Sequence, residues 1–141
     1  MTTDAERWLD FAREDVRMAE LALQWDIFNQ TCFHSQQCTE KALKSLISSR
    51  GTSPPRTHRL VDILSMLEPA LLADIANDIQ LLDRFYIPTR YPDALPGALP
   101  DDLPTRQDAE QALTIAQQVL KVADEAIKQV RREEKEQSES G

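Results

Sequence analysis

Glycine and aromatic residues are scarce in this chain: it has only three glycines among 141 residues, and aromatic residues make up 6% of it. A phosphate-binding loop of the P-loop or dinucleotide-binding type needs several glycines close together, and a hydrolase nucleophile elbow needs a serine between glycines. The sequence contains neither arrangement. The common glycine-dependent nucleotide and hydrolase sites are therefore excluded.

Long hydrophobic runs are also missing, since no stretch approaches 18 consecutive apolar residues. The first residues, Met1 to Arg7, lack the basic and then apolar pattern of a signal peptide. We therefore expect a cytoplasmic protein that makes no use of a membrane.

Potential metal ligands are few, because the chain has two cysteines and two histidines. Neither His34 nor His58 belongs to a Glu-x-x-His pair, and no set of these residues has the spacing of zinc ligands. Cys32 and Cys38 would point about 120° apart on one helix, so they cannot bridge each other there. We expect no metal, no cofactor and two small, at least half-buried thiols.

Positive charge is in the minority, with 16 Lys and Arg against 24 Asp and Glu and a formal net charge of -8. Nucleic-acid backbones repel such a chain unless its cations are concentrated locally. General DNA binding is therefore not expected, and any anion site must be a local group of cations.

Good helix formers dominate the sequence, and its apolar residues recur at intervals of three and four, which is typical of amphipathic helices. Thr3-x-x-Glu6 and Thr105-x-x-Asp108 have the spacing of capping boxes, and Gly51 is typical of the end of a helix. Thr57 is the expected cap of a short third helix. The predicted helices cover residues 4–25, 28–50, 58–67, 69–85 and 105–130.

Breaks between these helices are marked by proline. Tandem prolines make residues 51–56 a loop, and prolines at every fourth position make residues 87–104 one long loop. Residues 131–141 are charged and lack apolar anchors, so we expect a disordered tail. The predicted architecture is a single all-α domain over residues 4–130, an antiparallel up-and-down bundle of four to five helices.

The first candidate site is a group of cations around the loop after the second helix. Arg50, Arg56, His58 and Arg59 occur there without an intervening acidic residue. Backbone N–H groups at the start of the third helix would add to a phosphate site. The alternative is a solvated loop with no ligand.

A second candidate lies at the start of the long loop, where the only two tyrosines, Tyr86 and Tyr91, flank Arg90. An arginine between aromatic rings can hold a base or a phosphate. It can equally fix the loop to the bundle, with Arg90 paired to a carboxylate.

A third candidate is a polar face in the middle of the second helix. Glu40 and Lys44 are four residues apart, as in an ordinary surface ion pair. Gln36, Gln37 and Lys41 lie nearby at the edge of the apolar stripe, where polar groups often face a partner helix or a ligand groove. The sequence leaves both interpretations open.

Three segments in this order resemble the HEPN family. They are residues 36–44 (QQCTEKALK), residues 57–60 (THRL) and residues 86–93 (YIPTRYPD), and the resemblance extends over about residues 4–130. It implies an antiparallel four- or five-helix bundle, usually a homodimer and often encoded beside a minimal nucleotidyltransferase. Wide apolar stripes on the first and last helices also favour a homodimer.

Several members of that family are ribonuclease toxins in which an arginine is followed after four to six residues by a histidine that acts as acid and base. This sequence departs from the pattern. Seven residues separate Arg50 from His58, one separates Arg56 from His58, and no histidine follows Arg90.

The resulting hypothesis is a non-catalytic, nucleotide-associated partner of a minimal nucleotidyltransferase in a two-component, toxin–antitoxin-like system. Its ligand, a nucleotide or RNA, would contact Arg56, His58, Arg59, Arg90 and Tyr91, and Gln37, Glu40, Lys41 and Lys44 would face a partner or groove. One alternative is an endoribonuclease toxin in which His58 is the acid and base. Another is a helical interaction module that binds no ligand.

Overall fold

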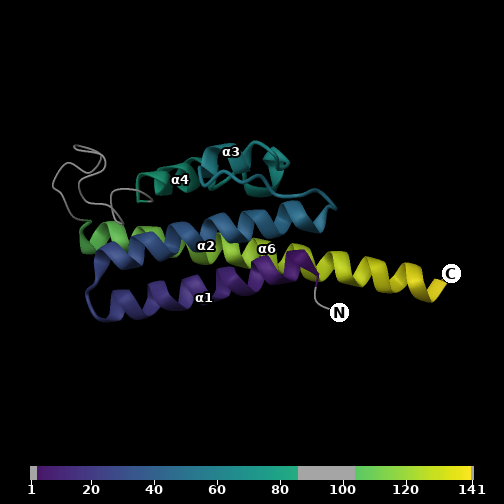
Figure 1. The fold of residues 1–141 in the computed structure, drawn as a ribbon, viewed down its shortest axis with the longest axis horizontal. Helices are drawn as coiled ribbons and strands as arrows, with labels where there is room; N and C mark the ends of the chain where they lie inside the picture. Colours follow the sequence, from purple (N-terminus) through teal and green to yellow (C-terminus); the bar gives the residue numbers. More distant parts are fainter. Residues whose placement is uncertain (1–2, 86–103, 141) are drawn as a thin grey trace.

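The computed structural model describes residues 3–85 and 104–140, and every regular element in these ranges is a helix. Three long helices form the body of the molecule: α1 (Asp4–Gln24), α2 (Phe28–Ser49) and α6 (Arg106–Ser140). A layer of short segments lies over α2 (Figure 1). It consists of α3 (Leu60–Leu64), the 3-10 turn η1 (Pro69–Leu72), α4 (Ala76–Leu81) and the 3-10 turn η2 (Leu82–Phe85). The all-α prediction is confirmed.

The chain reverses direction from each part of the bundle to the next (Figure 1). α1 and α2 form an antiparallel hairpin, the short layer runs back along α2, and α6 then follows the direction of α2. This is the predicted up-and-down arrangement, and it places α2 between α1, α6 and the short layer.

The ends of α1 and α2 follow the local sequence signals. The hydroxyl of Thr3 accepts a hydrogen bond from the Glu6 backbone N–H at 3.1 Å, and the Glu6 carboxylate accepts one from the Thr3 N–H at 3.2 Å. α2 ends where Gly51 adopts a φ of 82°, a left-handed conformation that glycine tolerates best. Both predicted helix ends are therefore correct to within about one residue.

A continuous apolar core joins all these segments. Small residues of α1 and α6 allow the long helices to approach closely, and larger side chains of α2 and the short layer fill the space between them. The core includes Ala12, Ala19, Leu43, Leu46, Leu60, Ile63, Ile79, Phe85, Ala116 and Val119. Cys32 and Cys38 are free, fully buried thiols within it, as expected. Burial raises the pKa of Cys32 to about 12.

The predicted helix over residues 69–85 is wrong as a single element, because it consists of η1, α4 and η2. Thr57 is also not the cap of α3. The residue before α3 is Arg59, which makes no capping bond. Instead the carboxylate of Asp83 accepts hydrogen bonds from the N–H groups of Leu60 and Val61, at 2.7 and 3.3 Å. A cap supplied from 23 residues away leaves no local sequence signal.

The expectation that the last helix ends near residue 130 is wrong as well. The predicted capping box of Thr105 and Asp108 is present at the start of α6, which begins at Arg106 and continues to Ser140. Residues 131–140 are mostly Arg, Lys, Glu and Gln, which lose little side-chain freedom in a helix, and no glycine or proline interrupts them. The predicted disordered tail is thus largely a helical extension that projects beyond the bundle (Figure 1).

Two further expectations from the sequence concern membrane-spanning helices and the long loop. None of the helices described has both the length and the apolar character needed to cross a membrane. The predicted long loop at residues 87–104 falls almost entirely outside the described residues.

We predict that Asp83→Ala lowers the free energy of unfolding by about 1–2 kcal/mol, because it leaves two backbone donors of α3 without their acceptor. Urea unfolding followed by circular dichroism measures this change. Asp78→Ala is the matched control, since Asp78 is an exposed acidic residue at the start of α4. Equal effects of the two substitutions would contradict the capping role of Asp83.

Candidate functional site

A buried ion pair lies in the middle of α2. The ammonium nitrogen of Lys44 is 3.2 Å from Oε2 of Glu40, and the two side chains are only 5% and 4% exposed. The same nitrogen lies 5.3 Å from the centre of the Trp8 ring of α1, close enough for a cation–π interaction. The pair is thus not the ordinary surface pair that its spacing alone would suggest.

The loop that precedes α3 is attached to this pair through His58. Nδ1 of His58 lies 3.2 and 3.3 Å from the two carboxylate oxygens of Glu40, while 54% of the histidine side chain remains exposed. The side-chain amide of Gln36 donates to the His58 carbonyl at 3.3 Å, and Gln37 donates to Gln36 at 2.7 Å. Side-chain and backbone contacts together therefore hold the loop on α2.

Two groups of residues that the sequence analysis treated as separate candidates meet here. Glu40 and Lys44 came from the predicted partner face, and His58 came from the predicted phosphate-binding loop. Arg56 and Arg59 flank His58 and are exposed to solvent. We call the exposed Arg56, His58 and Arg59 together with the buried Glu40 and Lys44 the loop site.

Charge is distributed unevenly within the loop site. Glu40 would cancel the charge of the loop if it were alone, but Lys44 already compensates it inside the molecule. Arg50, at the start of the loop, is paired with an acidic residue: its guanidinium nitrogen lies 4.0 Å from a carboxylate oxygen of the exposed Glu68. Arg56 and Arg59 are therefore the cations that the loop presents to solvent beside the imidazole of His58.

One predicted component of the phosphate site is not available. The N–H groups of Leu60 and Val61, at the start of α3, are bonded to Asp83 rather than open to an anion. Burial raises the pKa of Asp83 above its ordinary value, and the two backbone hydrogen bonds act in the opposite direction. Anion binding at this end of α3 would therefore depend on the side chains of the loop.

Lys41, the remaining member of the predicted partner face, belongs to a different polar cluster. Its ammonium nitrogen is 2.5 Å from Oδ2 of Asp15 on α1, and Nδ1 of His34 is 2.9 Å from Oδ1 of the same carboxylate. The sequence analysis missed Asp15, His34 and Trp8. One sequence feature could have indicated that Asp15 is buried and paired. It is an acidic residue on the apolar side of α1, beside Val16 and between Ala12 and Ala19.

Arg90, Tyr86 and Tyr91 lie outside the described residues, so the second candidate site remains a prediction. Among the residues that are described, His, Cys, Asp and Glu side chains form no group of three that could hold a metal ion.

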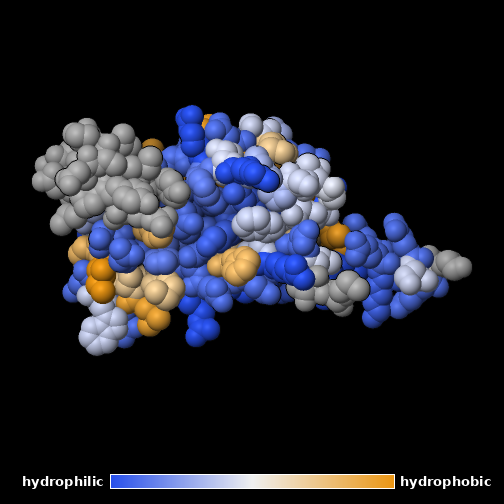
Figure 2. Space-filling model, in the orientation of Figure 1, coloured by the Kyte–Doolittle hydropathy of each residue, from blue (hydrophilic) through white to orange (hydrophobic). Residues whose placement is uncertain are grey.

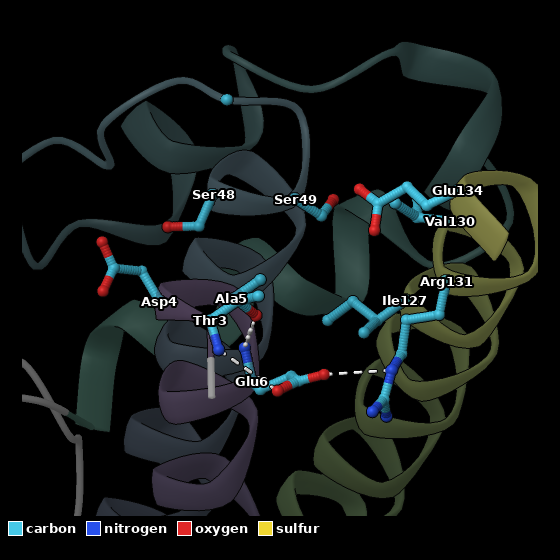
Figure 3. A pocket seen from close by; sticks show the side chains of 11 residues that line it. Thr3, Asp4, Ala5, Glu6, Ser48, Ser49, Ile127, Val130, Arg131 and Glu134 are labelled. Carbon is cyan, nitrogen blue, oxygen red and sulfur yellow. Dashed lines mark hydrogen bonds and ion pairs between the residues drawn. The ribbon is translucent and has the colours of Figure 1, made fainter. Parts of the chain in front are cut away.

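A hollow of about 320 Å³ opens where the start of α1, the end of α2 and α6 meet (Figure 3). Arg131 on its α6 wall lies 3.1 Å from Glu6, so the overhanging part of α6 is tied to α1. Glu134 and Asp4 also line it, but none of Arg56, His58 and Arg59 does. This hollow is separate from the loop site.

Comparison with known proteins identifies both a family and a curated relative. Residues 5–127 match the model of the HEPN domain. The chain is 29% identical over 135 residues to a Methanocaldococcus jannaschii protein named "Putative toxin MJ1304", with 89% of each chain covered.

Two solved structures are also similar. TT1696 from Thermus thermophilus has 37% sequence identity and a TM-score of 0.76, and the match covers 88% of this chain and 98% of that one. ST0689, described as an archaeal HEPN homologue, has 32% identity and a TM-score of 0.67, with 90% and 99% covered.

The burial of Glu40 and Lys44 leads to a prediction about stability. Lys44→Met should lower the free energy of unfolding by about 3 kcal/mol, because it removes the main partner of a buried carboxylate. Combining it with Glu40→Gln should cost less than the sum of the two single changes, which urea unfolding of all three variants would measure.

The control is the pair of Lys128 and Asp124, which are also four residues apart, with the Lys128 nitrogen 3.0 Å from Asp124 Oδ2 and the lysine side chain 58% exposed. Lys128→Met should change the free energy of unfolding by less than about 1 kcal/mol. Strict additivity of the Lys44 and Glu40 substitutions would show that the two side chains are not coupled.

Proposed function

The chain belongs to the HEPN domain family, and on that premise we propose that it is a nucleotide-associated protein that works beside a minimal nucleotidyltransferase in a two-component, toxin–antitoxin-like system. In this proposal the protein is a non-catalytic partner that acts as a homodimer. The name of its Methanocaldococcus jannaschii relative supports the toxin–antitoxin setting. The proposed ligand is a nucleotide or a short RNA, bound through its phosphates.

The observation that carries this proposal is the exposure of Arg56 and Arg59 on a loop that α2 holds in place. The loop belongs to a chain with a net charge of -8, yet residues 50–61 contain no acidic residue. Arginine side chains bind phosphate through two parallel N–H donors, and they do so best when their backbone is held in place. The contacts of His58 with Glu40 and Gln36 supply that restraint.

The arrangement of Glu40 and Lys44 supports the same proposal. A carboxylate below a cationic loop would ordinarily oppose an incoming phosphate, but here Lys44 compensates it. Arg90 and Tyr91 are proposed to add a second set of contacts from the following loop, as predicted from the sequence. Gln37 and Lys41, which are partly exposed on α2, are proposed to face the partner protein.

We expect the double variant Arg56→Ala/Arg59→Ala to weaken ATP binding at least tenfold, because two charge-assisted contacts to phosphate are lost. Isothermal titration calorimetry with ATP, GTP and a short RNA measures the dissociation constants. The titrations use the full chain, alone and in complex with its co-purified nucleotidyltransferase. The affinity of the wild type should fall with rising salt.

Arg7→Ala/Arg17→Ala is the matched control, since both arginines are exposed on α1 and outside the loop site. It should leave the dissociation constants within about twofold, because it removes the same formal charge elsewhere. If neither the chain nor its complex binds any of the three ligands, the nucleotide proposal fails. A complete absence of ligand-induced thermal shift would then favour an interaction module without a ligand.

A second candidate function is supported by the pair of His58 and Glu40. A carboxylate at one ring nitrogen fixes the orientation and tautomer of an imidazole, and the half-exposed ring could exchange protons with a bound RNA. Arg56 or Arg90 would steady the phosphate in this endoribonuclease. The arginine-to-histidine spacing of the known ribonuclease members is absent, so this function ranks second.

His58→Ala separates the two candidates. An endoribonuclease would lose RNA cleavage and cell toxicity on this substitution, and Glu40→Gln would lower cleavage by at least about tenfold through misorientation of the ring. His34→Ala is the control, because His34 also contacts a carboxylate but lies outside the loop site. Unchanged cleavage by His58→Ala would eliminate the endoribonuclease.

A further inference from the structure

One flank of α1 carries a row of large apolar side chains that the fold leaves exposed. Phe11, Met18, Leu21 and Trp25 are 53%, 49%, 52% and 72% exposed. Ile27, at the turn into α2, is 47% exposed. Elsewhere in the described residues, Met66 and Leu81 are the large hydrophobic side chains with comparable exposure. We call the five residues of this row and turn the α1 stripe.

The α1 stripe is distinct from the side of α1 that builds the core. Leu9, Ala12, Val16 and Ala19 face the bundle and are buried. The flank toward α6 is polar, and Arg13 forms an ion pair there with Asp124 at 2.6 Å. Figure 2 shows apolar surface gathered over the end of α1 and the start of α2, at the lower left of that view. Grouped exposed apolar side chains of this kind are typical of interaction sites.

The spacing along the stripe suits a second helix. Phe11, Met18 and Trp25 are seven residues apart, and Leu21 lies between the last two. Side chains at these positions lie on one side of α1 at the heptad spacing found between packed helices, with the exposed Glu14 between Phe11 and Met18. The stripe therefore fits a helix laid along α1 better than it fits a small molecule.

The spacing is also symmetric about Met18, with Phe11 seven residues before it and Trp25 seven residues after it. Two copies of α1 placed antiparallel about a two-fold axis would bring Met18 next to its own equivalent. Phe11 of each copy would then lie against Trp25 of the other. A two-fold interface must be self-complementary in this way.

A hollow of about 220 Å³ stands where such an interface would receive a side chain. It is lined by Met18, Leu21, Trp25, Ile27, Gln30 and His34. Its walls are almost entirely apolar, and the half-buried contact of His34 with Asp15 lies at its edge. An aromatic ring from a second copy would fill this hollow mainly against apolar side chains.

We infer that the α1 stripe is the surface through which two copies of this chain associate, with Phe11 of each copy seated in the hollow beside Trp25 of the other. This inference rests on the homodimer of the proposed function and names its surface. The stripe lies apart from Arg56, His58 and Arg59, so the dimer forms without covering the loop site.

Light scattering after size-exclusion chromatography tests the inference on the full chain. The wild type should have twice the 16.0 kDa mass of the chain. Phe11→Glu and Trp25→Glu should each give the mass of one chain, with an unchanged circular dichroism spectrum because both positions are exposed. Met66→Glu, at a position 44% exposed on the short layer, is the matched control and should remain a dimer.

Cross-linking gives a second test that does not depend on weakening the dimer. Met18→Cys should yield a disulfide-linked dimer when an added oxidant removes two electrons and two protons from the paired thiols, whereas Met66→Cys should not. The native Cys32 and Cys38 are fully buried and should not react.

The outcomes separate the inference from the proposal on which it rests. A wild type with the mass of one chain would overturn both the homodimer and its surface, and would point to a helix of another protein as the occupant of the stripe. A wild-type dimer that survives Phe11→Glu and Trp25→Glu, without cross-linking through Met18→Cys, would overturn only the surface.

Discussion

The burial of α2 is the constraint on which the rest of the molecule depends. Helices α1 and α6 and the short layer surround it, so most of its residues are buried. A polar group in that position is stable only with partners inside the protein, because leaving it unpaired costs about 1–3 kcal/mol, and more if it is charged. Among the described residues, the buried hydroxyl of Ser35 is the one side-chain group on α2 that has no such partner. Glu40 satisfies this requirement with Lys44 on its own helix and His58 on the following loop.

This constraint connects folding with the loop site. The loop of residues 51–59 has no regular secondary structure. Its position is fixed by the contacts of His58 with Glu40 and Gln36. The short layer is fixed in a similar way, since Asp83 of η2 accepts from the start of α3. Two carboxylates, one in a helix interior and one in a 3-10 turn, thereby position the segment that carries Arg56 and Arg59.

Periodicity and capping boxes were sufficient to predict the long helices, and three short segments correctly identified the family. The polar contacts that shape the candidate site were beyond such reasoning, because they join residues 18 to 23 positions apart. Glu40 and Lys44 have the spacing of a surface pair, and nothing local indicates that Trp8 and the loop cover them. The end of α6 was missed for another reason: a charged sequence without apolar anchors is compatible with both a solvated helix and a disordered tail. The roles of Arg90 and Tyr91 stay predictions.

The chain has two tryptophans, and they stand in different surroundings. Trp8 lies beside Lys44, below the loop site, whereas the indole of Trp25 is largely in water at the end of α1. The intrinsic tryptophan fluorescence of the protein therefore comes from two separate regions. A change in emission from Trp8 would report on the ion-pair network, and a change from Trp25 on events at the helical hairpin. Single-tryptophan forms of the chain would let an optical measurement follow each region separately.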